Sequence, residues 1–150
     1  MVSITSVKWL SESQQAAWRA LILTMQRLDE TLDRQLQRDA GMPHAYYALL
    51  VALSERPNRI ARMGDLAAEM CFSQSRLSHA ISKMEQAGWV QRRPDPDDRR
   101  GTLAVLTDPG YRVLRDAAPG HVQCVRESVF DRLTERQVNQ LRLICEAILK

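Results

Sequence analysis

The sequence predicts a mainly α-helical fold with one small β-hairpin (an α+β class), and three observations lead to this prediction. Apolar residues recur at steps of three and four along most of the chain, which is the period of an amphipathic helix. Glycine and proline account for only six residues each and aromatic residues for 5% of the chain, which disfavours a β-sandwich. Residues 89–106 are the exception, because they contain two β-forming runs around a loop rich in proline and aspartate.

Length and composition describe one ordinary domain. A chain of 150 residues buries about 70% of its unfolded surface, so its core needs neither a metal nor a disulfide. No apolar run approaches the roughly 18 residues of a membrane span, and the first residues lack the pattern of a signal peptide. We therefore expect a cytoplasmic protein without a membrane segment. The three cysteines, Cys71, Cys124 and Cys145, lack metal-ligand spacing, so we expect reduced thiols, no metal and no cofactor.

The first element is a long helix over residues 11–38. Ser11 and Gln14 fit a capping box at its start, and polar residues occupy the face opposite the apolar stripe. Such a helix is about 42 Å long, more than a compact domain of this size usually holds, so part of it should pack outside the domain core. The apolar stripe consists of Trp18, Leu21, Ile22, Met25, Leu28, Leu32 and Leu36.

A second helix follows a break in the chain. Gly41 ends the first helix, and Pro43 suits the first turn of the next. Residues 46–53 are apolar almost all round, which predicts a central, buried helix.

Two short helices come next, separated by the turn at residues 71–73. The first spans residues 63–70, and the second begins after Ser73, a good N-cap, and ends at Gly88. This arrangement is the helix-turn-helix unit. The inward positions of the second helix are Leu77, Ala80, Ile81 and Met84, and the outward positions are Gln74, Ser75, Arg76, Ser78, His79, Ser82 and Lys83. The outward side chains include no acid, as contact with base edges and phosphates requires.

The predicted hairpin follows directly. Residues 89–93 and 102–106 form its strands, and residues 94–101 form a charged loop of the kind called a wing, whose arginines suit the negative potential of the minor groove. The excess positive charge of the chain also lies in this part, since residues 56–101 carry nine basic and six acidic side chains.

The last part of the chain predicts two more helices. Thr107 caps the first, which tolerates Pro109 in its first turn and should run toward Arg132, with a kink or interruption at residues 119–120. Thr134 and Gln137 form another capping box. The final apolar stripe consists of Val138, Leu141, Ile144, Cys145, Ile148 and Leu149. An apolar chain end indicates burial against a partner.

These motifs together resemble a MarR-type transcriptional regulator. The resemblance rests on residues 63–67, 73–78, 85–92, 95–101 and 106–110, of which the wing segment with its Asp-x-Arg tip is the most specific. It implies a single domain over residues 1–150, with a winged helix-turn-helix part at 43–106 and a helical dimerisation part at 1–42 and 107–150. The function implied is that of a homodimeric repressor that binds a pseudo-palindromic operator in double-stranded DNA. Two recognition helices about 34 Å apart would meet successive major grooves.

The resemblance also assigns residues to sites. The DNA-binding residues implied are Ser73, Gln74, Ser75, Arg76, Ser78, His79, Lys83, Asp98, Arg99 and Arg100, with Asp98 orienting Arg100 in the minor groove. Family members often release DNA on binding a small aromatic compound. The side chains that would line such a pocket are Trp18, Met25, His44, Tyr46 and Tyr47, which also suit plain core packing. Oxidation of Cys71, in the turn, is the other regulatory option.

Two alternatives to DNA binding stay open, and neither is an enzyme. An enzyme is not expected, because the chain has three scattered histidines, no glycine-rich phosphate loop and no Ser-His-Asp pattern. A winged helix can instead be a protein-interaction module whose polar helix face is simply solvated. A ligand sensor that ignores DNA is the third reading, and loss of DNA affinity on Arg100→Ala distinguishes DNA binding from the other two.

Overall fold

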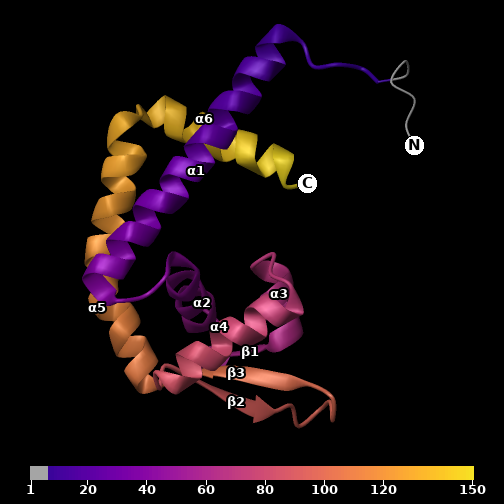
Figure 1. Cartoon of the computed structure of the whole chain (residues 1–150), viewed down its shortest axis with the longest axis vertical. Helices are drawn as coiled ribbons and strands as arrows, with labels where there is room; N and C mark the ends of the chain where they lie inside the picture. The colour runs from indigo at the N-terminus through magenta and orange to yellow at the C-terminus, as the bar shows by residue number, and fades with distance from the viewer. Residues whose placement is uncertain (1–6) are drawn as a thin grey trace.

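The computed structural model describes residues 7–150. Two parts are visible in Figure 1: a small winged unit, and an arm built from the long helices. The elements in chain order are α1 (Glu12–Ala40), α2 (His44–Ser54), η2 (Pro57–Arg59), β1 (Ile60–Arg62), α3 (Met63–Glu69), α4 (Gln74–Gln86), β2 (Val90–Pro94), β3 (Thr102–Leu106), α5 (Asp108–Ser128), η3 (Phe130–Arg132) and α6 (Glu135–Ile148). The prediction of a mainly helical fold with a small β-structure is confirmed.

Helix α1 begins and ends as its sequence predicts. The Ser11 hydroxyl accepts the Gln14 backbone N–H at 3.2 Å, and the Gln14 side chain accepts the Ser11 backbone N–H at 2.9 Å, which completes the capping box. Gly41 ends the helix in the left-handed conformation, with φ of 63°. The buried residues of α1 all lie near its C-terminal end, namely Leu32, Gln35 and Leu36. The rest of this helix therefore lies outside the core, in agreement with the argument from its length.

Helix α2 forms the centre of the winged unit. Its residues Leu49, Leu50 and Leu53 are fully buried, as its continuous apolar run predicts. Helices α3 and α4 and the sheet pack around it, and the core that they share also contains Leu66, Leu77, Ile81, Met84, Val90 and Ala104. This core fixes which faces of α3 and α4 point outward.

The sheet has three strands where the sequence predicted two. Strands β2 and β3 form the expected antiparallel hairpin, although β2 begins at Val90, one residue later than predicted, and continues through Pro94. Strand β1 pairs with the other edge of β3, with Ala61 opposite Ala104, so that the order is β1-β3-β2. A strand of three residues is too short to show alternation, and its existence depends on the free edge that β3 offers.

Helix α5 starts at a close approach between two chain segments. The Thr107 hydroxyl caps it by accepting the Gly110 N–H at 3.0 Å and donates to the Gly88 carbonyl at 2.6 Å. A Cβ on Gly110 would lie 2.1 Å from the Trp89 carbonyl oxygen, so this position requires glycine. The predicted interruption at residues 119–120 is wrong in part, because α5 continues through Pro119 to Ser128 and follows a curved course (Figure 1). It ends before Arg132, which lies in η3.

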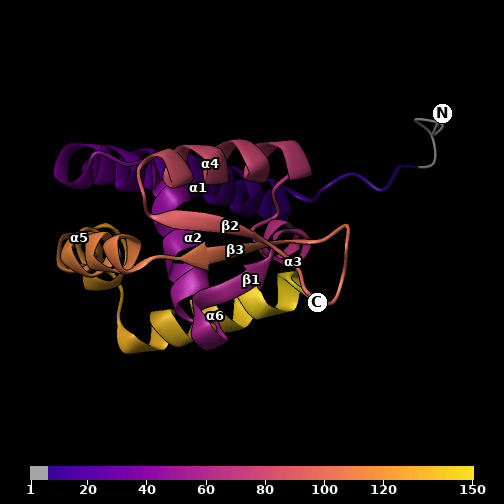
Figure 2. The same cartoon turned by 90° about the horizontal axis from the view of Figure 1, so that it is seen from below.

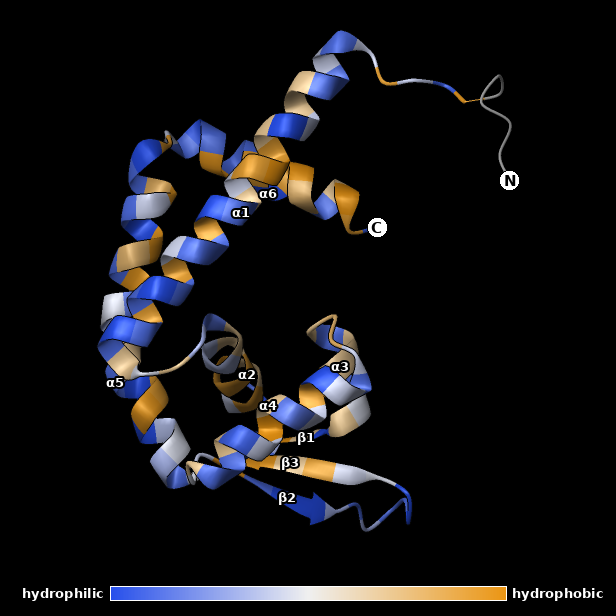
Figure 3. Cartoon of the chain, in the orientation of Figure 1, coloured by the Kyte–Doolittle hydropathy of each residue, from blue (hydrophilic) through white to orange (hydrophobic). Residues whose placement is uncertain are grey.

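Helix α6 buries none of its residues within the chain. The predicted capping box is present, because the Thr134 hydroxyl accepts the Gln137 N–H at 3.3 Å and the Gln137 side chain accepts the Thr134 N–H at 2.9 Å. Helices α1 and α6 cross in Figure 1, yet Figure 2 shows them on opposite sides of the molecule. Apolar residues recur along both helices in Figure 3. In the part of the chain that the structure describes, no helix is both long and apolar enough to cross a membrane.

Candidate nucleic-acid interface

The turn between α3 and α4 sets the direction of α4. The Phe72 N–H donates to the Ala67 carbonyl at 2.9 Å, and Cys71 adopts a left-handed conformation with φ of 52°. Ser73 then caps α4, since its hydroxyl accepts the Arg76 N–H at 3.1 Å. The four predicted inward residues of α4, Leu77, Ala80, Ile81 and Met84, are all buried. The opposite face of α4 is therefore held toward solvent by the core itself.

That outward face carries the side chains that the sequence assigned to DNA. Of the predicted contact residues, all seven between Ser73 and Lys83 are exposed. The Arg76 guanidinium lies 3.9 Å from the centre of the Phe72 ring, a cation–π contact that joins it to the turn before α4. The single acid of α4, Glu85, pairs with Arg92 at 3.0 Å. The Arg92 backbone N–H and guanidinium lower the pKa of the Glu85 carboxyl, which keeps it ionised and its charge balanced.

The wing is a loop closed by its own aspartates. The Asp95 carboxylate accepts the Asp97 N–H at 3.0 Å, and the Asp98 carboxylate accepts the Arg100 backbone N–H at 3.0 Å. We expected Asp98 to orient the side chain of Arg100. In the structure, Asp98 instead accepts the backbone N–H of Arg100 and does not contact its guanidinium. A carboxylate two residues before an N–H reaches it readily, which is the geometry of an Asx turn. Asp98, Arg99 and Arg100 are all exposed at the tip.

One wing acid is buried beneath the loop. The Asp95 side chain is only 3% exposed, and the Arg62 Nε lies 2.8 Å from its Oδ2 atom. The N–H does not point along the line to this oxygen, so the contact is an ion pair and not an aligned hydrogen bond. It ties the base of the wing to strand β1. The pair also removes one of the three wing acids from the surface, so the exposed wing is more basic than its sequence suggests.

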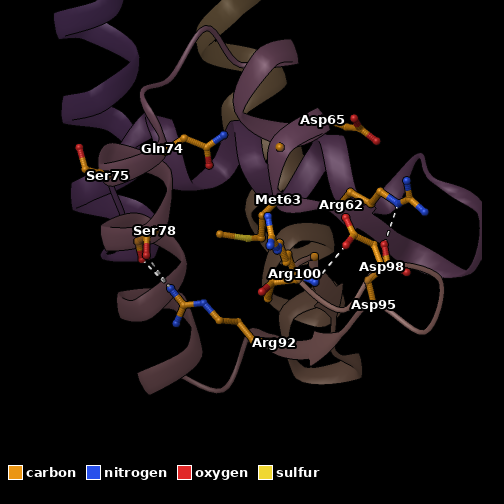
Figure 4. Close-up of a pocket in the computed structure, with 13 residues that line it drawn as sticks. Arg62, Met63, Asp65, Gln74, Ser75, Ser78, Arg92, Asp95, Asp98 and Arg100 are labelled. Atoms are coloured by element: carbon orange, nitrogen blue, oxygen red, sulfur yellow. Dashed lines mark hydrogen bonds and ion pairs between the residues drawn. The ribbon is translucent and has the colours of Figure 1, made fainter.

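Helix α4 and the wing enclose a groove of about 650 Å³, shown in Figure 4. It brings together five of the predicted contact residues: Gln74, Ser75, Ser78, Asp98 and Arg100. The other five, Ser73, Arg76, His79, Lys83 and Arg99, lie on the exposed surface outside its lining. Sequence analysis missed Arg62, Asp65, Arg92 and Asp95, which also line the groove. The signal available for Arg92 was its place in the predicted strand that directly follows the recognition helix, whereas Arg62 belongs to the strand that was not predicted.

The cations around this groove divide into two groups. Arg62 and Arg92 are paired with Asp95 and Glu85. Within residues 7–150, a second group has no carboxylate within 4.0 Å and comprises Arg76, Lys83, Arg93, Arg99 and Arg100. All five of these unpaired cations are exposed, and exposed unpaired cations on the helix-turn-helix and the hairpin suit a polyanion such as DNA.

The residues assigned to a ligand pocket lie in two places. His44 and Tyr47 surround the buried His121 ring, with ring centres 5.5 Å and 4.3 Å from it, respectively. Trp18 and Met25 lie on α1 and are more than half exposed, and Trp18 is about 16 Å along that helix from Asp29, which His44 contacts. Tyr46 is partly buried against the core. The pocket for a small aromatic compound stays a prediction.

The described residues contain no group of three or more His, Cys, Asp or Glu side chains placed to hold a metal ion. Cys71 is exposed in the turn, Cys145 is exposed on α6, and Cys124 is partly buried on α5.

Comparisons with known proteins agree with this geometry. The MarR family model matches residues 40–101. The chain is 51% identical to Sco3205, a MarR family transcriptional regulator from Streptomyces coelicolor solved in complex with DNA, with a TM-score of 0.92 over 96% of this chain and 90% of that one. It is 38% identical to AbsC, another MarR family regulator from Streptomyces coelicolor, with a TM-score of 0.89 over 95% of this chain and 96% of that one.

A more distant relative is the transcriptional repressor MprA of Escherichia coli strain K12, which is 24% identical over 73% of this chain. The chain spans 61% of the length of that repressor. The match to Sco3205 extends over nearly the whole of both chains and includes the winged unit and the helical arm. The chain therefore belongs to the MarR family of transcriptional regulators.

Proposed function

We propose that this chain is a sequence-specific DNA-binding transcriptional regulator that acts as a homodimer and represses transcription. The observation that carries the proposal is the groove between α4 and the wing, around which the exposed hydrogen-bonding face of α4 and the unpaired arginines meet. Sco3205, which is similar over nearly the whole chain, was solved with DNA, and MprA is a repressor.

Helix α4 and the wing contact different grooves of the DNA. Helix α4 enters the major groove, which is about 12 Å wide and displays a distinct donor and acceptor pattern for each base pair. Its polar residues near the N-terminal end, Gln74, Ser75 and Ser78, reach the base edges. The wing carries Arg100 to the adjacent minor groove, where negative potential favours a guanidinium. The remaining cations contact phosphates and set the register of the protein on the duplex.

The homodimer follows from surfaces that a single chain leaves exposed. The apolar side chains on α1 and α6 that are at least 39% exposed are Trp18, Leu21, Leu23, Met25, Leu141, Leu143, Ile144 and Ile148. Because α6 buries no residue within the chain, a second copy is the occupant that covers these apolar side chains in a symmetric pair. The pair places two α4 helices on one side of a duplex, so we expect a pseudo-palindromic operator.

The test starts with selection of bound duplexes from a random-sequence pool, because this requires no knowledge of the operator. Fluorescence anisotropy then compares the selected duplex with a scrambled one while salt is varied from about 50 to 300 mM. We expect a clear preference for the selected duplex. Arg100→Ala should lose about 1–3 kcal/mol of binding free energy, whereas Arg115→Ala, an exposed arginine on α5, should lose none. If no sequence is enriched and both duplexes bind weakly and equally, the winged unit serves a protein partner instead.

A small aromatic effector would act on this same DNA-binding activity. The anisotropy assay detects it as release of the selected duplex when such compounds are added.

A further inference from the structure

Arg92 makes an unusual set of contacts between β2 and α4. Its Nη1 donates to the Glu85 carboxylate at 3.0 Å, and its Nη2 lies 2.8 Å from the Ser78 carbonyl oxygen and 3.0 Å from the Ser82 hydroxyl. The Arg92 backbone N–H donates to the other Glu85 oxygen at 3.0 Å. The side chain is only 28% exposed and its charge is balanced by Glu85. The guanidinium is therefore occupied inside the protein and is not one of the free cations for phosphate.

The same guanidinium determines what the two serines beside it can do. The Arg92 Nη2 also donates to the Ser78 hydroxyl oxygen at 3.2 Å, as Figure 4 shows. The Ser82 hydroxyl donates its proton to the Ser78 carbonyl at 2.9 Å, so both of its hydrogen-bonding functions are used. The Ser78 hydroxyl proton, in contrast, has no acceptor among residues 7–150. Ser78 is exposed and lines the groove between α4 and the wing.

The positive charge of Arg92 restricts the direction of that proton. The Arg92 Nη2 shares its two N–H groups among the Ser78 carbonyl, the Ser82 hydroxyl and the Ser78 hydroxyl, and the positive charge of the guanidinium turns the Ser78 O–H bond away from Arg92. The Ser78 side chain is exposed and lines the groove, so a proton turned away from Arg92 is open to an acceptor that enters there. The hydroxyl is thus presented as a hydrogen-bond donor before any ligand arrives.

We propose that Arg92 is a positioning residue for sequence recognition, which holds α4 against the wing and presents the Ser78 hydroxyl as a donor to an acceptor atom on a base edge. The inference rests on the proposed function, because it concerns how that same surface distinguishes sequences. The major-groove acceptors are N7 and O6 of guanine, N7 of adenine and O4 of thymine. Cytosine presents an amino donor there, so the base opposite Ser78 is one of the other three.

The test measures coupling between single side chains and single base atoms. The selected duplex is made with analogues that lack one acceptor each: 7-deazaguanine, 7-deazaadenine, 2-aminopurine in place of guanine, and a thymine analogue without O4. We expect one such replacement to weaken binding of the wild-type protein about 2- to 10-fold, the value of one hydrogen bond. Ser78→Ala should bind the natural duplex correspondingly less well and be indifferent to that same replacement.

The Arg92 variants then separate positioning from direct contact. Arg92→Gln combined with Glu85→Gln keeps the net charge, and Arg92→Lys keeps the positive charge with a different donor geometry. The double variant should also become indifferent to the base replacement, because the Ser78 proton is free to turn toward the helix backbone. Its salt slope should match that of the wild type, whereas Arg100→Gln should reduce the slope by about one. Arg93→Gln, the exposed neighbour on β2, is the control: it removes one unpaired cation, so it should weaken binding to all duplexes alike and keep the wild-type sensitivity to the base replacement.

The outcomes distinguish an error in the role of Arg92 from an error in the proposed DNA-binding function. Circular dichroism and thermal unfolding first establish that each variant is folded. If the double variant and Arg92→Lys both keep full sensitivity to the base replacement, Arg92 does not position Ser78 and the inference is wrong. The same holds if no replacement couples to Ser78, or if the double variant lowers the salt slope as Arg100→Gln does. If the wild-type protein has no preference for its selected duplex, the proposed function fails instead.

Discussion

Replacing Arg62 by methionine removes the guanidinium 2.8 Å from the buried Asp95 carboxylate and keeps much of the aliphatic stem. The two side chains are unequally buried: Asp95 is 3% exposed and Arg62 53% exposed. Two opposite unit charges about 4 Å apart attract each other by about 4 kcal/mol at an effective dielectric constant of 20. The cost of removing the carboxylate from water offsets part of this attraction. Because water reaches Arg62, we expect Arg62→Met to lower the free energy of unfolding by about 1–3 kcal/mol.

Because Asp95 is buried and Arg62 is half-exposed, replacing one or the other should have unequal effects on stability. Asp95→Asn leaves a half-exposed arginine that water can solvate, and its amide oxygen still accepts the Asp97 N–H, so it should cost less than Arg62→Met. The double variant should be more stable than Arg62→Met alone, because no buried charge remains. Urea unfolding of the four proteins followed by circular dichroism measures all three differences. The reasoning is refuted if Arg62→Met unfolds within about 0.5 kcal/mol of the wild type, or if Asp95→Asn is the more damaging change.

Three further variants test other parts of the structure. Gly110→Ala should lower the melting temperature by about 10 °C or more, since its Cβ would lie 2.1 Å from the Trp89 carbonyl; an unchanged value contradicts that contact. Ile144→Glu should shift sedimentation from a dimer toward the 17.1 kDa chain, and a persistent dimer would exclude α6 from the interface. Burial, with the nearby His44, lowers the pKa of His121, so stability should fall as pH drops below about 6.5. His121→Gln should reduce that fall in urea unfolding between about pH 7.5 and 5.5.

The direction of the pH effect on stability follows from the lowered pKa of His121. The unfolded chain binds a proton at the ordinary histidine pKa, whereas the folded protein resists it, so the stabilisation is complete above the unfolded pKa and is lost as the pH falls toward the folded one. A wild-type protein whose pH dependence equals that of the variant would show that His121 does not contribute.

Local signals predicted much of the fold because they act within a few residues. The capping boxes at Ser11 and Thr134, and the apolar positions of α4, depend on spacings of three and four and are confirmed. The interruption predicted at Pro119 is absent. Pro119 has no N–H to donate to the carbonyl of Arg115, but both residues are exposed on α5, so water can bind that carbonyl and the helix continues.

The parts that sequence reasoning missed depend on contacts between distant segments. Strand β1 exists because β3 offers a free edge, and the Arg62–Asp95 pair joins positions 33 residues apart. The clamp of Arg92 on α4 likewise requires the hairpin to fold back against the helix. The outward residues of the candidate site were predictable from the period of α4, but the partners that orient them were not, because no pattern in the sequence specifies which arginine is paired internally.

Binding of the purified protein to a selected duplex, with the scrambled duplex of equal length as control, tests the central claim most directly. The account predicts clearly tighter binding to the selected sequence, an affinity that falls as salt rises, and a loss of about 1–3 kcal/mol of binding free energy in Arg100→Ala with stability unchanged. Equal affinity for both duplexes, unaffected by Arg100→Ala, would contradict the assignment of the groove between α4 and the wing to DNA.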